Sequence, residues 1–134
     1  MTYIAWNERF SVANALIDRQ HQELFALIDQ AHGVIGGDPL KEYESIWQIL
    51  SALLEYTRSH FAEEEGMLER AGYPKLASHK VLHLDLLKKT EAKLNALENG
   101  EAGIDAEHLC RFIKEWIEHH ILVADRDYIP YLAS

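Results

Sequence analysis

The chain has 134 residues, with 22 acidic side chains, 13 basic side chains, eight histidines and one cysteine. This length is typical of one domain that folds without disulfides, and a single cysteine excludes a disulfide framework and cysteine-based zinc or iron–sulfur sites. The formal charge of −9 argues against nucleic acid and anionic membranes as partners. Because no apolar run reaches the length of a membrane span and no signal-peptide pattern is present, we expect one cytoplasmic domain over residues 1–134.

The N-terminal segment, residues 1–17, is expected to be an irregular arm that packs through Trp6 and Phe10. Asp18 is a candidate N-cap for a first helix that ends before Gly36 and Gly37. A second helix is expected to begin at Asp38, which precedes a proline at the first helical position.

Two further breaks follow, at residues 72–74 and 99–103, and Asp105 is a candidate N-cap for the last long segment. The four segments between breaks lack internal proline, are far longer than ordinary strands, and carry apolar residues at helical spacing. We therefore predict an all-α protein, an up-down-up-down antiparallel four-helix bundle. Residues 127–134 are expected to form a short closing tail.

Six polar residues fall within the apolar stripes of these four segments. They are His21, His60, Glu64, His79, His83 and His120. Two pairs, at residues 60/64 and 79/83, are four apart and so share a helix face. Taken singly, a histidine on an apolar face is usually a hydrogen-bonded core residue, and the acidic run at residues 63–65 is usually solvated. Histidines in all four stripes together with an interior carboxylate favour a metal site, because buried charges are normally paired or bound to metal.

The residue types also restrict the kind of metal. Imidazole and carboxylate without thiolate fit iron, zinc or manganese, and five histidines exceed the four ligands of a zinc site, which favours two ions. A zincin is excluded because Lys80 follows His79 where that motif needs glutamate. The ferritin-like pattern is excluded because no glutamate has a histidine three residues later.

Nearly the whole chain resembles the hemerythrin family in its single-domain bacterial form. The resemblance is carried by Trp6, by the IDRQH run ending at His21, by HFAEEE from His60, by Tyr73-Pro74, by His79-x-x-x-His83, and by WIEHHI around His120 followed by Asp125 and Tyr128. In combination this order of histidines and carboxylates is highly specific.

The resemblance implies two iron ions in the bundle. One iron would be held by His79, His83 and His120, and the other by His21 and His60. Glu64 and Asp125 would bridge them together with an oxo or hydroxo group, and the iron with two histidines would keep an open position for dioxygen. Spacing alone does not select Asp125, because five residues beyond His120 is about 140° around an ideal helix. A distorted or ending helix is therefore needed there, and Asp127 is the nearby competitor.

An apolar oxygen pocket is expected to slow oxidation by excluding water. The candidates, which any bundle would also place in its core, are Leu24, Phe61, Trp116 and Ile117. The family often has phenylalanine where this chain has Leu86, a change that can alter the pocket volume. The other three histidines match no ligand position and are interpreted as structural, as is the cysteine; they are His32, His108, His119 and Cys110.

The function implied by the resemblance is reversible dioxygen binding for carriage, storage or delivery, by a protein that is not an enzyme. The expected partners are dioxygen and an unidentified oxygen-accepting protein, and the expected state is a monomer or weak oligomer. The alternatives are an oxygen- or redox-sensing module and a di-iron enzyme acting on peroxide or nitric oxide. Signalling relatives usually carry further domains and repair-type relatives carry N-terminal cysteines, neither of which this sequence contains.

Overall fold

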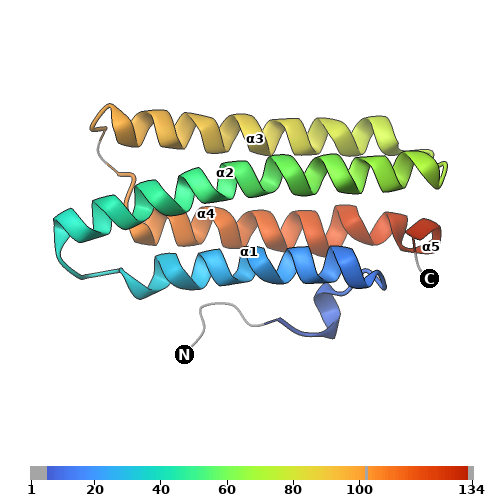
Figure 1. Ribbon diagram of the computed structural model, residues 1–134, viewed down its shortest axis with the longest axis horizontal. Coiled ribbons are helices and arrows are strands. Elements are labelled where there is room, and N and C mark those ends of the chain that lie inside the picture. Colours follow the sequence, from blue (N-terminus) through green and yellow to red (C-terminus); the bar gives the residue numbers. More distant parts are fainter. Residues whose placement is uncertain (1–5, 102, 133–134) are drawn as a thin grey trace.

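Four long helices lie side by side in the computed structural model, which describes residues 6–101 and 103–132 (Figure 1). The helices are α1 (Ala15–Gly33), α2 (Pro39–Arg70), α3 (Leu76–Glu98) and α4 (Ala106–His119). They alternate in direction, and the principal helix contacts are those of α2 with α3, of α1 with α4 and of α1 with α2. The predicted all-α four-helix bundle is confirmed. Within the described residues, no helix combines the length and the hydropathy needed to cross a bilayer.

Short helical turns before α1 and after α4 lie at the end of the bundle that holds the α2–α3 connection (Figure 1). A 3-10 turn, Glu8–Phe10, precedes α1. After α4 the chain continues through a π-helical turn (His120–Ala124), a 3-10 turn (Asp125–Tyr128) and α5 (Ile129–Leu132). The predicted arm and tail are thus partly ordered into helical turns, and their outermost residues, 1–5 and 133–134, lie outside the described part.

Two of the three predicted N-caps are correct. The Asp38 carboxylate accepts a hydrogen bond from the Leu40 backbone N–H at 3.3 Å, and Asp105 accepts one from the His108 N–H at 2.8 Å. Each bond satisfies a backbone donor that has no partner inside its helix. These caps therefore determine where α2 and α4 begin.

The prediction that Asp18 caps the first helix is wrong. The N-cap lies four residues earlier, at Asn14, whose side chain accepts a hydrogen bond from the Ile17 N–H at 3.1 Å. Asp18 lies inside α1 and accepts hydrogen bonds from Ser11 Oγ at 2.6 Å and from the Val12 N–H at 2.9 Å. Its role is therefore to fasten the N-terminal arm to the first turn of α1.

Replacing Asp18 with alanine should destabilise the protein by about 1–3 kcal/mol, because the two hydrogen bonds go to a charged acceptor and Val12 is fully buried. Urea denaturation at neutral pH measures this change. Glu44→Ala, at an exposed position of α2, is the matched control and should change the stability by less than about 0.5 kcal/mol. Equal effects of the two substitutions would contradict the fastening role.

A polar layer separates two apolar clusters along the bundle. The larger cluster includes Leu24 and Ile117, whereas the smaller includes Ile17 and Tyr128. His21 lies between Ile17 and Leu24 on α1, and the other buried histidines occupy the same level of the bundle. The apolar clusters on both sides keep this layer away from solvent.

Candidate metal centre

All seven residues expected to hold metal converge on one buried site. Their side chains come from α1, α2 and α3 and from the turns that follow α4, and each is 5% exposed or less. The nitrogen and oxygen atoms that face one another form two overlapping groups, which share Glu64. The structure thus places together His21, His60, Glu64, His79, His83, His120 and Asp125.

The helical spacing explains how three pairs of these residues reach the centre. On α2 and α3 the pairs at residues 60/64 and 79/83 are four apart, so ordinary α-helical turns place both members on one face. His120 and Asp125 are five apart, and the chain between them forms the π-helical turn. Because the bonds of a π turn run from residue i to i+5, the extra residue is absorbed and Asp125 returns to the inner face. Asp127, the competitor, is exposed and pairs with Lys75 at 3.7 Å.

The first group contains three histidines and one oxygen from each carboxylate. His79 Nε2 lies 2.8 Å from Glu64 Oε1 and 3.0 Å from Asp125 Oδ1. His120 Nε2 is also 3.0 Å from Asp125 Oδ1, and His83 Nε2 is 3.2 Å from Glu64 Oε1. Five donor atoms therefore surround one point.

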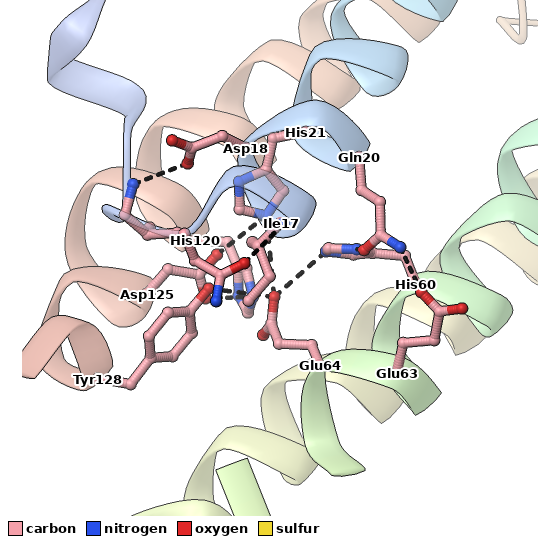
Figure 2. A network of polar contacts seen from close by, with 12 residues as sticks. Ile17, Asp18, Gln20, His21, His60, Glu63, Glu64, His120, Asp125 and Tyr128 are labelled. Atoms are coloured by element: carbon pink, nitrogen blue, oxygen red, sulfur yellow. Dashed lines mark hydrogen bonds and ion pairs between the residues drawn. The ribbon is translucent and has the colours of Figure 1, made fainter. Parts of the chain in front are cut away.

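The second group, formed by two histidines and Glu64, uses the opposite oxygen of this carboxylate, and the opposite oxygen of Asp125 faces the same side. His60 Nε2 lies 3.2 Å from Glu64 Oε2, and His21 Nε2 lies 3.5 Å from Asp125 Oδ2 and 3.8 Å from Glu64 Oε2. Figure 2 shows Glu64 between His60 on one side and Tyr128 on the other. Each carboxylate thus directs one oxygen to two histidines of the first group and the other oxygen to the second group, an arrangement suited to bridging two cations.

The charges at the site favour a cation. Burial alone would raise the pKa of Glu64, but hydrogen bonds from the surrounding histidines hold this pKa well below its usual value. Burial disfavours a charged His79, but the carboxylates of Asp125 and Glu64 raise its pKa to about 9. The ion pairs that the two carboxylates make within the described chain are all with histidines, so compensation depends on imidazole or on metal.

Hydrogen bonds on the outer side of two imidazoles fix their tautomers. His60 Nδ1 donates to Gln20 Oε1 at 2.6 Å, and Gln20 in turn donates to Glu63. His83 Nδ1 donates to Glu65 Oε2 at 2.7 Å. With Nδ1 protonated, the neutral ring presents the lone pair of Nε2 to the centre, which is the form that binds metal.

Sequence reasoning does not identify these supporting residues. An acidic run such as residues 63–65 is usually solvated, whereas Glu65 is partly buried and bonded to a histidine. Tyr128 enters the sequence analysis only as part of the family pattern, and its hydroxyl donates to Glu64 Oε2 at 3.2 Å. Burial and the nearby carboxylates raise its pKa well above the usual value, so this donor stays protonated. The sequence offers one indication of such supporting residues, which is that Gln20 and Glu65 each stand next to a candidate ligand in the chain.

The donor set fits two metal ions. Several buried atoms, including His21 Nε2, His60 Nε2 and both Asp125 oxygens, have no hydrogen-bond partner within the described residues. His83 Nε2 and His120 Nε2 lie 3.1 Å apart, so two ring nitrogens meet without an acceptor oxygen between them. Leaving such groups unsatisfied in the core is costly, and a cation between them removes the cost. Imidazole and carboxylate donors without thiolate suit iron.

The four expected pocket residues lie close to these groups but differ in burial. Leu24, Phe61 and Ile117 are almost fully buried, and the Phe61 ring stacks on His83 with centroids 3.8 Å apart. Trp116 is partly buried and stacks on His120 at 4.9 Å. Of the three histidines interpreted as structural, His32 and His119 are exposed. The third, His108, lies on α4 and contacts Lys93 of α3.

Comparisons with known proteins agree with this geometry. Residues 12–132 match the family model described as "Hemerythrin HHE cation binding domain". The chain is 32% identical over 126 residues to a bacteriohemerythrin of Clostridium acetobutylicum, an alignment covering 92% of this chain and 97% of that protein. It is 27% identical to the bacteriohemerythrin of Methylococcus capsulatus, with both chains fully covered.

Animal proteins and solved structures extend the similarity. A hemerythrin of Sipunculus nudus is 32% identical over 123 residues, covering 92% of this chain and 88% of that one. A crystal structure of wild-type hemerythrin superposes with a TM-score of 0.88 at 26% identity, covering 98% of this chain and 99% of the other. The family model spans nearly the whole fold, and the four-helix bundle with its buried histidines and carboxylates agrees with it. This chain therefore belongs to the hemerythrin family.

Proposed function

We propose that the two atom groups hold two iron ions and that the protein binds dioxygen reversibly there. In this proposal His79, His83 and His120 hold one iron, His21 and His60 hold the other, and Glu64 and Asp125 bridge them. The main support for this proposal is that each carboxylate directs one oxygen to each of the two histidine groups. The group with two histidines has one donor fewer, which leaves room there for a small ligand.

The choice of dioxygen rests on the family and on the donor set. Relatives named bacteriohemerythrin and hemerythrin cover nearly all of this chain. A bound pair of ferrous ions supplies two electrons, which suits reversible binding of dioxygen. A site with five imidazoles and only two carboxylates is less anionic than the carboxylate-rich di-iron pattern, and this favours binding over oxidation chemistry.

The protein's own residues would preserve bound ligand by controlling protons and water. Tyr128 keeps its proton and directs it to Glu64 Oε2, so it orients that carboxylate without acidifying the centre. Leu24, Phe61 and Ile117 present apolar side chains that are 2% exposed or less. An apolar wall of this kind slows the entry of water, which would otherwise promote irreversible oxidation.

An iron count followed by an oxygen titration tests the proposal. The purified protein should hold close to two irons per chain, and its reduced form should develop visible absorption in air that disappears under vacuum. One zinc and no iron would overturn the metal assignment. Prompt irreversible oxidation with release of peroxide would favour an enzyme over an oxygen-binding protein.

The remaining features of the proposal concern the protein as a whole. We infer one hemerythrin-like domain over residues 1–134, acting in the cytoplasm as a monomer or weak oligomer and not as an enzyme. The family match across residues 12–132 and the hemerythrin names of its relatives support these inferences. Delivery of oxygen to an acceptor protein is the corresponding partner proposal, and co-purification with the oxygenated form tests it.

A further inference from the structure

A groove of about 720 Å³ runs along the surface between α3 and α4. Contacts between these two helices are sparse compared with those of α2 with α3 and of α1 with α4. Most of the groove surface is apolar, and its lining includes Leu82 and Leu86 on α3 and Phe112 and Trp116 on α4. Its volume falls within the range of about 300–1,000 Å³ that is typical of sites for small molecules.

One cation in this groove lacks an anionic partner. Lys93 packs over the Phe112 ring, with its ammonium 4.5 Å from the ring centroid, and donates to His108 Nε2 at 2.7 Å. No carboxylate of the described residues lies within 4.0 Å of it, whereas Lys89, one turn earlier on α3, pairs with Asp85 at 2.9 Å. Partial burial and the nearby Lys89 lower the pKa of Lys93. The charge of an anion bound to this ammonium would compensate for both effects.

The two ends of the groove differ in chemistry. Lys93, which donates to His108, lies toward the start of α4, while Leu86, Trp116 and His120 line the part near the metal centre. The lining also contains two carboxylates, that of Asp85, which pairs with Lys89, and that of Glu115. The floor of the part near the metal centre is Trp116, whose ring stacks on His120 with an interplanar angle of 12°. A ligand with one negative end and an apolar chain matches this order of a cation followed by an apolar channel.

We propose that the α3–α4 groove binds a medium-chain monocarboxylate, with its carboxylate on Lys93 and its hydrocarbon chain along Leu86 and Trp116. The carboxylate accepts a charge-assisted hydrogen bond from the ammonium. The chain covers apolar surface that is otherwise in contact with water. Because His120 lines the groove beside Trp116, the bound chain lies next to a candidate metal ligand.

Calorimetric titration of the iron-loaded protein with decanoate tests the proposal. Decanoate should bind in one-to-one ratio, and Lys93→Met should weaken it about tenfold because a charge-assisted hydrogen bond is lost. Ala92→Trp, at an exposed lining position, should abolish binding by filling the groove. Lys41→Met, at an exposed position of α2, is the matched control and should leave the affinity unchanged.

Two further measurements separate this groove from other sites. Acetate carries the same carboxylate without the chain, so binding of acetate as tight as that of decanoate would place the ligand on iron and overturn the proposal. Absence of decanoate binding, or binding unchanged in both groove variants, would also overturn it. Sedimentation of the free protein provides the last check, because a dimer that Ala92→Trp dissociates would identify a second copy of the chain as the occupant.

Discussion

Replacing Glu64 with alanine is expected to abolish stable iron binding and to cause the largest loss of stability of any single substitution at the centre. This carboxylate is fully buried and lies within 3.8 Å of four histidines. Its removal takes one donor from each metal position and leaves imidazoles without a counter-charge. Removing one partner of such a buried network typically costs about 3–5 kcal/mol, and loss of the bound ions adds to it.

Iron analysis and thermal unfolding of the purified variant measure the two effects. His119→Ala is the matched control, because His119 adjoins His120 in the chain but is exposed and outside both donor groups. It should retain close to two irons and the parent stability. Full iron content in the Glu64 variant would show that this carboxylate is not a ligand.

The iron-free protein is expected to lose stability as the pH rises from 6.5 to 9. The carboxylates of Asp125 and Glu64 raise the pKa of His79 from 6.5 to about 9 in the folded state. A group whose folded pKa is raised contributes stability that is complete below pH 6.5 and is lost as the pH passes through the folded value. The expected loss over this interval is about 2 kcal/mol.

Three other groups at the centre have lowered pKa values and act outside this interval. Burial lowers the pKa of His60, so its effect on stability lies below pH 6.5. Both carboxylates have lowered pKa values and matter only in acid. Urea denaturation of chelator-treated protein at a series of pH values tests the expectation. The iron-loaded protein should not share the loss, because metal requires neutral imidazole and binds more tightly as protons leave. Parallel curves for the two forms would contradict this account.

The bundle and most of the centre could be predicted because one sequence property determines both. Apolar residues at helical spacing identify the inner face of each helix, and a histidine within that stripe must point inward with its neighbours. His60 and Glu64, or His79 and His83, therefore required no knowledge of the tertiary structure. The start of α1 was harder, since Asn14 and Asp18 are both good capping residues and only contacts with the arm distinguish them.

Asp125 and the α3–α4 groove could not be predicted from periodicity. Ideal helix geometry turns Asp125 away from His120, and only the family pattern favours it until the π-helical turn is taken into account. Periodicity does not predict the groove either, because Phe112 and Trp116 have the helical spacing of ordinary core residues. Periodicity reports which face of a helix is apolar, but it does not report how closely the neighbouring helix approaches.

The π-helical turn also bears on how fast metal can leave. π-Helical turns are rare and short, and irregular segments of this kind open locally far more often than the whole protein unfolds. The long-range bonds of the segment after this turn include those of Arg126 to the Arg9 carbonyl at 2.8 Å and of Tyr128 to Glu64. Opening there would withdraw Asp125 while α1, α2 and α3 remain packed. We therefore expect the rate of iron exchange to follow the hydrogen-exchange rate of residues 120–128 and to be much faster than global unfolding.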